Sequence, residues 1–127
     1  MSKEYIAYEG SAYVVEWYFD QNGRSQSFDY YNLLSDNEKI KILRLLKRIG
    51  DAGEIKDTTK FNYEGDKIYA FKPKPDRFLC FFFEKGKIII TNAFRKKQQK
   101  LPMNEKIKAL SSKKDYELRV KESDYYD

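Results

Sequence analysis

Two neighbouring apolar runs constrain the fold more than any other feature of the chain. Residues 77–84 form a nearly continuous aromatic run, residues 87–94 have three isoleucines near their centre, and Lys85-Gly86-Lys87 joins the two. A strand without polar alternation is expected where both faces of a sheet are covered. A connection this short allows only antiparallel pairing. The two runs therefore predict an antiparallel hairpin that is buried on both faces.

Two further segments have strand character. Residues 67–72 precede Pro73-Lys74-Pro75-Asp76, and the prolines of this motif interrupt a regular ladder and predict a turn. Together with the hairpin, this segment predicts a small antiparallel meander. Residues 13–19 are rich in β-branched and aromatic side chains and predict an earlier strand, which ends at the turn signal Gln21-Asn22-Gly23.

Helical signals lie between these strand segments. Ser27 can cap a short helix. Ser35 and Glu38 have the spacing of a capping box, in which each side chain bonds an open backbone amide at a helix start. Apolar residues follow at helical spacing until Gly50 or Gly53, where a helix can end. The N-terminal half therefore predicts two helices in a short hairpin.

The fold class expected from these signals is α+β. It combines a small antiparallel-meander sheet, the two N-terminal helices in a hairpin, and a C-terminal helix from about residue 104 to beyond residue 115. No linker or internal repeat is visible, so residues 1–127 are expected to form a single domain. Residues 117–127 are acidic and rich in tyrosine, and we expect them to form a mobile tail.

Composition excludes several kinds of chemistry. The chain has no histidine, which removes histidine-based zinc sites and Ser-His or Cys-His nucleophiles. Cys80 is the sole cysteine, so no intrachain disulfide is possible, and its aromatic surroundings in the sequence predict a buried thiol. Residues 1–10 are too polar for a signal peptide, and no apolar run approaches membrane-spanning length. A cytoplasmic protein without metal or cofactor is expected.

Positive charge is concentrated in one part of the chain. The formal net charge is +5, and residues 85–114 contain ten lysines and arginines but only one acid, Glu105. The predicted strand order brings the segment that contains Lys72, Lys74 and Arg77 to the same sheet end as Arg95-Lys96-Lys97. So many like charges repel one another, and a polyanion such as RNA would relieve the repulsion.

Such a cluster has the groups that RNA cleavage requires. RNA supplies its own nucleophile, the 2′-hydroxyl, so the protein needs a base, cations for the charged transition state, and an acid for the leaving 5′-oxygen. A crowded lysine can serve as base or acid, and arginine suits bidentate phosphate contact. The nearby carboxylates, Asp76 and Glu84, are too few for a two-metal nuclease.

Four motifs in the second half of the chain resemble a known toxin family. They are Tyr69-Ala70-Phe71-Lys72, Arg77-Phe78-Leu79, Gly86-Lys87-Ile88-Ile89-Ile90-Thr91, and Phe94-Arg95-Lys96-Lys97-Gln98-Gln99-Lys100-Leu101-Pro102. They are similar to the RelE/HigB-type toxins of type II toxin–antitoxin systems (the RelE/ParE superfamily), in particular the phage-derived HigB-like branch. This resemblance implies an mRNA endonuclease that acts in the ribosomal A site and arrests translation. It also implies a cognate antitoxin, often a helix-turn-helix protein, as partner.

The resemblance further implies which residues form the site. The matching catalytic positions are Lys72, Arg77, Arg95 and Lys96, and the RNA-binding positions are Lys74, Lys97, Gln98 and Lys100. Arg77 and Arg95 are expected to bind the phosphate. Lys72 or Lys96 is expected to transfer the proton. Many relatives have His-Gly before the phenylalanine of the last motif, where this chain has Asn92-Ala93, so a catalytic histidine is not available here.

Two other functions remain open at this point. ParE-type toxins share the fold of this superfamily but inhibit gyrase and do not cleave RNA. A degenerate relative would bind its antitoxin and nothing else. Fold alone cannot choose among the three functions; an adjacent helix-turn-helix gene would favour either toxin over the degenerate relative.

Overall fold

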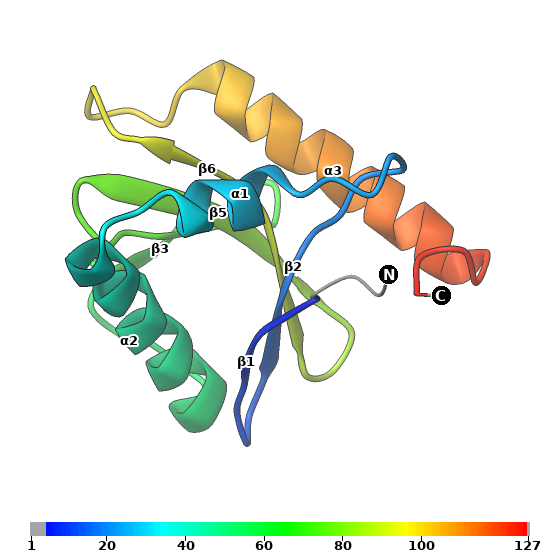
Figure 1. Ribbon diagram of the computed structural model, residues 1–127, viewed down its shortest axis with the longest axis horizontal. Helices are drawn as coiled ribbons and strands as arrows, with labels where there is room; N and C mark the ends of the chain where they lie inside the picture. The colour runs from blue at the N-terminus through cyan, green and yellow to red at the C-terminus, as the bar shows by residue number, and fades with distance from the viewer. Residues whose placement is uncertain (1–4, 127) are drawn as a thin grey trace.

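A six-stranded sheet forms the middle layer of the computed structural model, which describes residues 5–126 (Figure 1). The elements follow one another as β1 (Ile6–Glu9), β2 (Val14–Trp17), α1 (Gln26–Asn32), α2 (Asp36–Ala52), β3 (Phe61–Tyr63), β4 (Tyr69–Phe71), β5 (Asp76–Phe83), β6 (Lys87–Arg95) and α3 (Met103–Lys121). The α+β class is confirmed. Residues 1–4 and 127 of the expected domain lie outside the described residues.

The sheet is larger than a meander, and it is mixed. Its strand order is β1-β2-β6-β5-β4-β3, and β2 pairs with β6 in parallel, with Val14 opposite Lys87. The expectation of a small, purely antiparallel meander was therefore wrong. The meander β4-β5-β6 exists, but β1 and β2 form a second hairpin that extends it on the β6 side. This hairpin gives β6 a partner on its free edge, which would otherwise expose unpaired backbone groups.

The helical arrangement also differs from the expected N-terminal hairpin. The helices α1 and α2 follow two strands and so stand in the middle of the element order. Their main contacts are with different strands: α1 contacts β6, whereas α2 contacts β1 and β2. The start of α2 is as predicted, because Ser35 and Glu38 form a complete capping box, and Gly53 ends the helix with a φ of 85°. An amphipathic helix buries its apolar stripe against whichever apolar surface the sheet offers.

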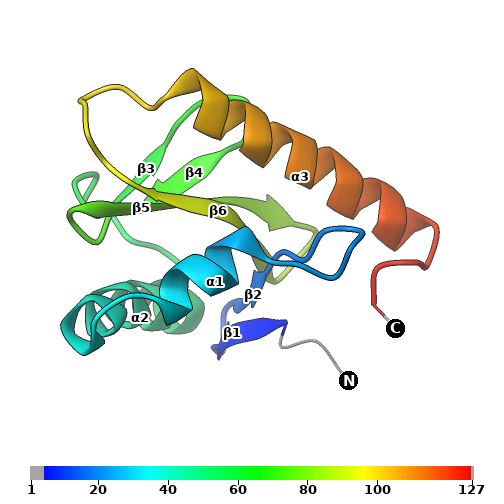
Figure 2. The ribbon, with the colours of Figure 1, turned by 45° about the horizontal axis from the view of Figure 1, so that its top comes forward.

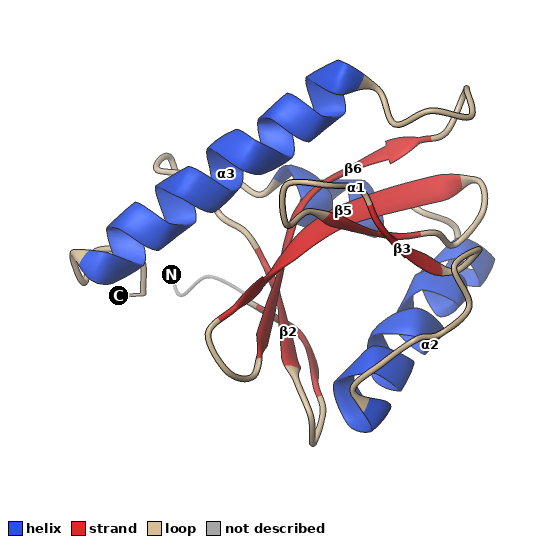
Figure 3. Ribbon diagram, turned by 180° about the vertical axis from the view of Figure 1, so that it is seen from behind, coloured by secondary structure: helices blue, strands red, loops and turns tan. Residues whose placement is uncertain are grey.

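The helices cover both faces of the sheet. Figure 2 shows α3 on one side and α1 with α2 on the other, and Figure 3 shows the same layers from behind. Phe78 and Cys80 of β5 pack on the α1/α2 side, whereas Leu79 and Phe81 pack on the α3 side. This two-sided burial explains the aromatic run in β5, as expected for a strand covered on both faces.

A β-bulge interrupts the pairing of β5 and β6. Leu79 lies opposite Asn92 and Cys80 lies opposite Ile90, so Thr91 is the extra residue. The Thr91 hydroxyl bonds the Leu79 carbonyl oxygen at 3.2 Å. One extra residue exchanges the faces toward which all later side chains of the strand point. As a result, Phe94 points to the α3 side and Arg95 to the α1/α2 side.

The C-terminal segment is packed against the rest of the protein. Where a mobile tail was expected from residue 117, α3 continues to Lys121, and the Tyr125 ring is 1% exposed. The Tyr125 hydroxyl accepts a hydrogen bond from the Phe19 backbone at 2.9 Å, and Arg119 lies over the Tyr125 ring, 4.7 Å from its centroid. These contacts hold the end of α3 against the chain that follows β2.

Candidate nucleic-acid interface

The turn before β5 and the end of β6 meet at one end of the sheet. The Lys96 backbone N–H donates to the Pro75 carbonyl at 2.9 Å, and Arg77 lies opposite Phe94 in the ladder. The convergence expected from strand order is therefore present in the backbone. Which side chains share a surface then depends on the face of the sheet to which each one points.

One pocket on the α3 side contains most of the expected site residues. Five of them line it: Lys72, Arg77, Lys96, Gln98 and Lys100. The same pocket is lined by Glu64, Ala70, Phe94, Gln99, Leu101 and Pro102. We call it the Arg77 pocket. Its floor comes from β4, β5 and β6, and its wall comes from the segment between β6 and α3.

Arg77 is the most constrained cation of this pocket. Its side chain is buried, with 8% exposure, and its Nη1 donates to the Asp76 carbonyl at 2.9 Å. Burial lowers the pKa of the Arg77 guanidinium, and the charges of Glu64 and Asp76 partly oppose this shift. No carboxylate within residues 5–126 lies within 4.0 Å of the guanidinium. A desolvated arginine without an ion-pair partner is a favourable site for an anion.

The lysines of the Arg77 pocket come from both of its edges. Lys72 follows β4 and donates from Nζ to the Thr58 carbonyl at 3.3 Å. Lys96 and Lys100 belong to the exposed segment that leads to α3. In the part of the chain that the structure describes, none of these three lysines forms an ion pair. The pocket therefore combines four cations with one carboxylate.

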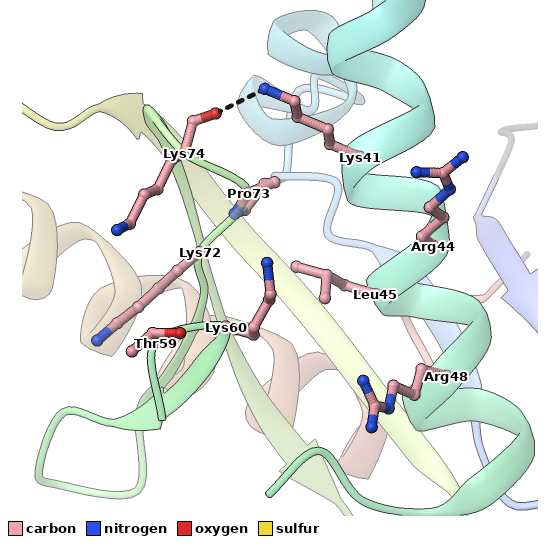
Figure 4. Close-up of a pocket in the computed structure, with 9 residues that line it drawn as sticks. All are labelled: Lys41, Arg44, Leu45, Arg48, Thr59, Lys60, Lys72, Pro73 and Lys74. Carbon is pink, nitrogen blue, oxygen red and sulfur yellow. Dashed lines mark hydrogen bonds between the residues drawn. The ribbon is translucent and has the colours of Figure 1, made fainter. Parts of the chain in front are cut away.

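Three expected site residues lie outside the Arg77 pocket. Arg95 lies on the opposite face of the sheet, where Nη2 is 3.1 Å from a carboxylate oxygen of Glu38. Lys97 lines a separate hollow beside α1 and the start of α3, together with Arg95. Lys74 lies at the edge of a groove beside α2 (Figure 4). The Thr91 bulge explains the placement of Arg95, because without it Arg95 would share the face of Arg77.

Glu64 also lines the pocket, although it is not among the site residues expected from the sequence. It follows β3, and its backbone N–H donates to the Ile68 carbonyl across the β3–β4 turn at 2.8 Å. Its charge contributes to the pKa of Arg77. No local pattern in the sequence marks Glu64, because it reaches the site only through the pairing of β3 with β4.

The pocket has the chemistry of an anion site. A phosphate group there would meet one buried guanidinium and the ammonium groups of three lysines, which is a common arrangement for binding RNA phosphates. Across residues 5–126, no group of three or more His, Cys, Asp or Glu side chains is arranged to hold a metal ion. Within the same range, no helix has the length and apolar character needed to cross a membrane.

Fold and pocket together define a small α+β protein with a cationic pocket at the end of a mixed sheet. Residues 29–114 match the family described as phage derived protein Gp49-like (DUF891), and because the match spans more than half of the chain, the protein belongs to this family. The Gp49-like family is a RelE-like family associated with toxin–antitoxin systems. No curated protein matches the chain.

Proposed function

We propose that the protein is the toxin of a type II toxin–antitoxin system, close to the HigB-like branch, and that it cleaves mRNA on the ribosome without a metal. Membership of the Gp49-like family supports the toxin assignment. The observation that carries the enzyme assignment is the Arg77 pocket, where a buried, unpaired guanidinium lies beside Lys72 and Lys96.

The pocket residues suit in-line attack by the RNA 2′-hydroxyl. The 2′-oxygen loses its proton to a base and bonds the adjacent phosphorus, while the bond from phosphorus to the 5′-oxygen breaks and that oxygen receives a proton. Arg77 binds the non-bridging oxygens, whose negative charge grows in the transition state. Lys72 and Lys96 are the candidates for proton transfer, and Glu64 is a further candidate for the base because it lines the same pocket.

The remaining pocket residues bind the RNA around the scissile phosphate. Gln98 and Lys100 line the wall of the pocket, where an amide and an ammonium can contact sugar and phosphate oxygens. The partner that silences the toxin is a cognate antitoxin, and an acidic segment would suit the exposed cations around the pocket. A helix-turn-helix antitoxin remains part of this proposal.

The decisive test is translation with purified components. Wild-type protein added to ribosomes and a defined mRNA should stop translation and produce cleaved mRNA, whereas Arg77→Gln and Lys96→Gln should leave the mRNA intact. Circular dichroism and thermal unfolding would show that the variants are folded. If translation continued with wild-type protein, the enzyme assignment would be wrong. Gyrase inhibition with intact mRNA would instead indicate a ParE-like toxin.

A further inference from the structure

A second cationic feature lies on the other side of the β4–β5 turn. A groove of about 460 Å³ runs between α2 and the edge of the sheet (Figure 4). Its lining residues are Lys41, Arg44, Leu45, Arg48, Thr59, Lys60, Lys72, Pro73 and Lys74. We call it the α2 groove. Six of these nine residues are cations and none is an acid. None of the site residues expected from the sequence lies on α2.

The cations on α2 form one row along the helix. Lys41, Arg44 and Arg48 are separated by three and four residues, so they share one face and span about 10 Å of the helix axis. Lys60 faces this row from the other wall, and its ammonium group points into the groove (Figure 4). This geometry gives the groove two cationic walls.

The positive charge of the groove is not neutralised from within the protein. Of the residues that the structure describes, none forms an ion pair with Lys41, Arg44, Arg48 or Lys60. Two acids outside the lining feel the charge of these cations: Lys41 affects Glu38, and Lys60 and Arg48 affect Asp57. Hydrogen bonds from Thr59, and then the charges of Lys60 and Arg48, lower the pKa of Asp57, but it lies beyond ion-pair distance of both cations. The groove therefore retains a large positive potential.

The α2 groove is continuous with the Arg77 pocket. Lys72 lines both features, and it extends away from α2 as Lys74 does (Figure 4). These two lysines form a cationic rim between the groove and the pocket. A single extended polyanion can therefore pass from one to the other without leaving positively charged surface.

We propose that the α2 groove binds the sugar–phosphate backbone of the same RNA strand whose scissile phosphate lies in the Arg77 pocket. The proposal rests on the proposed function, because it is that function which places RNA in the pocket. Arg44 and Arg48 contact phosphates on one side of the strand, and Lys60 contacts it from the other. The groove positions the substrate and takes no part in the chemistry.

The lining favours a polynucleotide over an acidic peptide. A tightly bound peptide normally places large apolar side chains in a pocket of the partner. The two apolar residues of this groove are Leu45, which is 7% exposed, and Pro73, which is also buried. The groove therefore offers no large exposed apolar side chain as an anchor site, and its six cations are the main attraction for a ligand. Charge repeats at every nucleotide of RNA, and release of its counterions drives such binding.

The test compares two charge-matched double variants of the full chain. Arg44→Gln/Arg48→Gln removes two groove cations, and Lys114→Gln/Lys121→Gln removes two exposed cations of α3 that form no ion pair among the described residues. The probe is a fluorescent 2′-O-methyl RNA strand of about 12 nucleotides, which cannot be cleaved through its 2′-oxygen. Fluorescence anisotropy at several salt concentrations gives the Kd and its salt dependence.

The groove variant should weaken binding on the order of tenfold and reduce the slope of log K against log salt by about 1.4, since each phosphate contact with a single strand contributes about 0.7. The α3 variant should bind like wild type. Equal losses in both variants, or none in the groove variant, would overturn the proposal. So would a groove variant that keeps its affinity for RNA and loses affinity for a glutamate-rich peptide.

These measurements separate the groove from the proposed function. Oligonucleotide binding that depends on Arg44 and Arg48, in a protein that leaves ribosome-bound mRNA intact, would support the groove and contradict the nuclease assignment. If the protein cleaved mRNA but its affinity for the RNA strand did not depend on Arg44 and Arg48, the nuclease assignment would be supported and the groove proposal contradicted. The four substituted side chains are all exposed, so both variants should fold like wild type. Thermal unfolding of each variant checks this.

Discussion

The guanidinium of Arg95 lies 3.1 Å from the carboxylate of Glu38, the same carboxylate that completes the capping box of α2. The backbone N–H of Ser35 donates to Glu38 at 3.0 Å. Hydrogen bonds from Ser35, followed by the charge of Arg95, hold the pKa of Glu38 below its usual value. Arg95 thus connects the end of β6 to the start of α2, on the face of the sheet opposite Arg77.

This pairing predicts unequal roles for the two arginines. Arg77→Gln should lower the rate of mRNA cleavage about 10²- to 10³-fold, as expected when a donor to a developing negative charge is removed. Arg95→Gln should lower it less than about tenfold, since Arg95 is already paired with Glu38 and lies outside the pocket. Single-turnover cleavage on ribosomes measures both rates. Equal losses would show that Arg95 reaches the substrate.

Glu64 gives a second prediction about the pocket. If it is the base, Glu64→Gln should reduce the cleavage rate about 10²-fold or more with little effect on the affinity for uncleavable RNA. If it only balances the charge of Arg77, the same variant should bind RNA more tightly, because Glu64 is the one acid among the described residues that line the pocket. Single-turnover rates and anisotropy titrations distinguish the two outcomes, and Lys72→Gln is the matched comparison for proton transfer.

Asp115 predicts a pH-dependent contribution to stability. Burial alone would raise the pKa of Asp115. Hydrogen bonds from Arg119, Gln21 and Tyr18 instead keep that pKa below its usual value. A depressed pKa stabilises the fold above the unfolded pKa, near 3.9, and the contribution disappears as pH falls through the folded value. Asp115→Asn should therefore lower the free energy of unfolding by about 1–2 kcal/mol at pH 7. Urea titrations should show this difference shrink below about pH 4; a constant difference would contradict the ion-pair explanation.

Cys80 predicts an unreactive thiol. The side chain is fully buried and burial raises its pKa well above the ordinary value, so neither access nor thiolate is available. Ellman's reagent should modify no thiol in the folded protein and one thiol per chain in denaturant. Rapid modification under native conditions would mean that β5 is exposed by local opening.

Substitution of Gly10 tests how closely the first hairpin packs against α2 at Gly50. A Cβ atom at Gly10 would lie 2.2 Å from the Gly50 carbonyl group, which also accepts hydrogen bonds from the backbone N–H groups of Ala12 and Tyr13. Gly10→Ala should destabilise the protein by about 1–3 kcal/mol, because backbone atoms must move. Gly86→Ala is an informative comparison: its Cβ meets nothing within 4 Å, so any loss there comes from its φ of 102°. Thermal unfolding of the two variants measures the difference.

Local patterns predicted the elements that form from short-range signals. The capping box at Ser35, the hairpin of β5 and β6, and the burial of Cys80 all follow from neighbouring residues. The pairing of β2 with β6 could not be predicted in this way. Each strand of the first hairpin has only four residues, and the parallel partner of Val14 is Lys87, far along the chain. Short strands have little periodicity from which to infer a partner.

The site was predictable only as far as side-chain alternation holds. Arg77 and Lys72 face the pocket as alternation along β4 and β5 requires. Arg95 does not, because the Thr91 bulge exchanges the faces of β6 and no residue type marks a bulge reliably. The α2 groove was missed for another reason. The spacing of Lys41, Arg44 and Arg48 is visible in the sequence, but the wall opposite them comes from the sheet edge and exists only in the folded protein.

The parallel pairing of β2 with β6 also bears on the order in which the protein folds. The β5–β6 hairpin closes a short loop and can form early, whereas the docking of β2 on β6 needs an exposed β6 edge and closes a loop that includes α1, α2 and most of the sheet. Closing that loop is slow, because ordering so much chain costs entropy before the new contacts form. We therefore expect a folding transition state in which β5 and β6 are paired but β2 has not docked on β6, so that substitutions in Val14–Trp17 mainly accelerate unfolding.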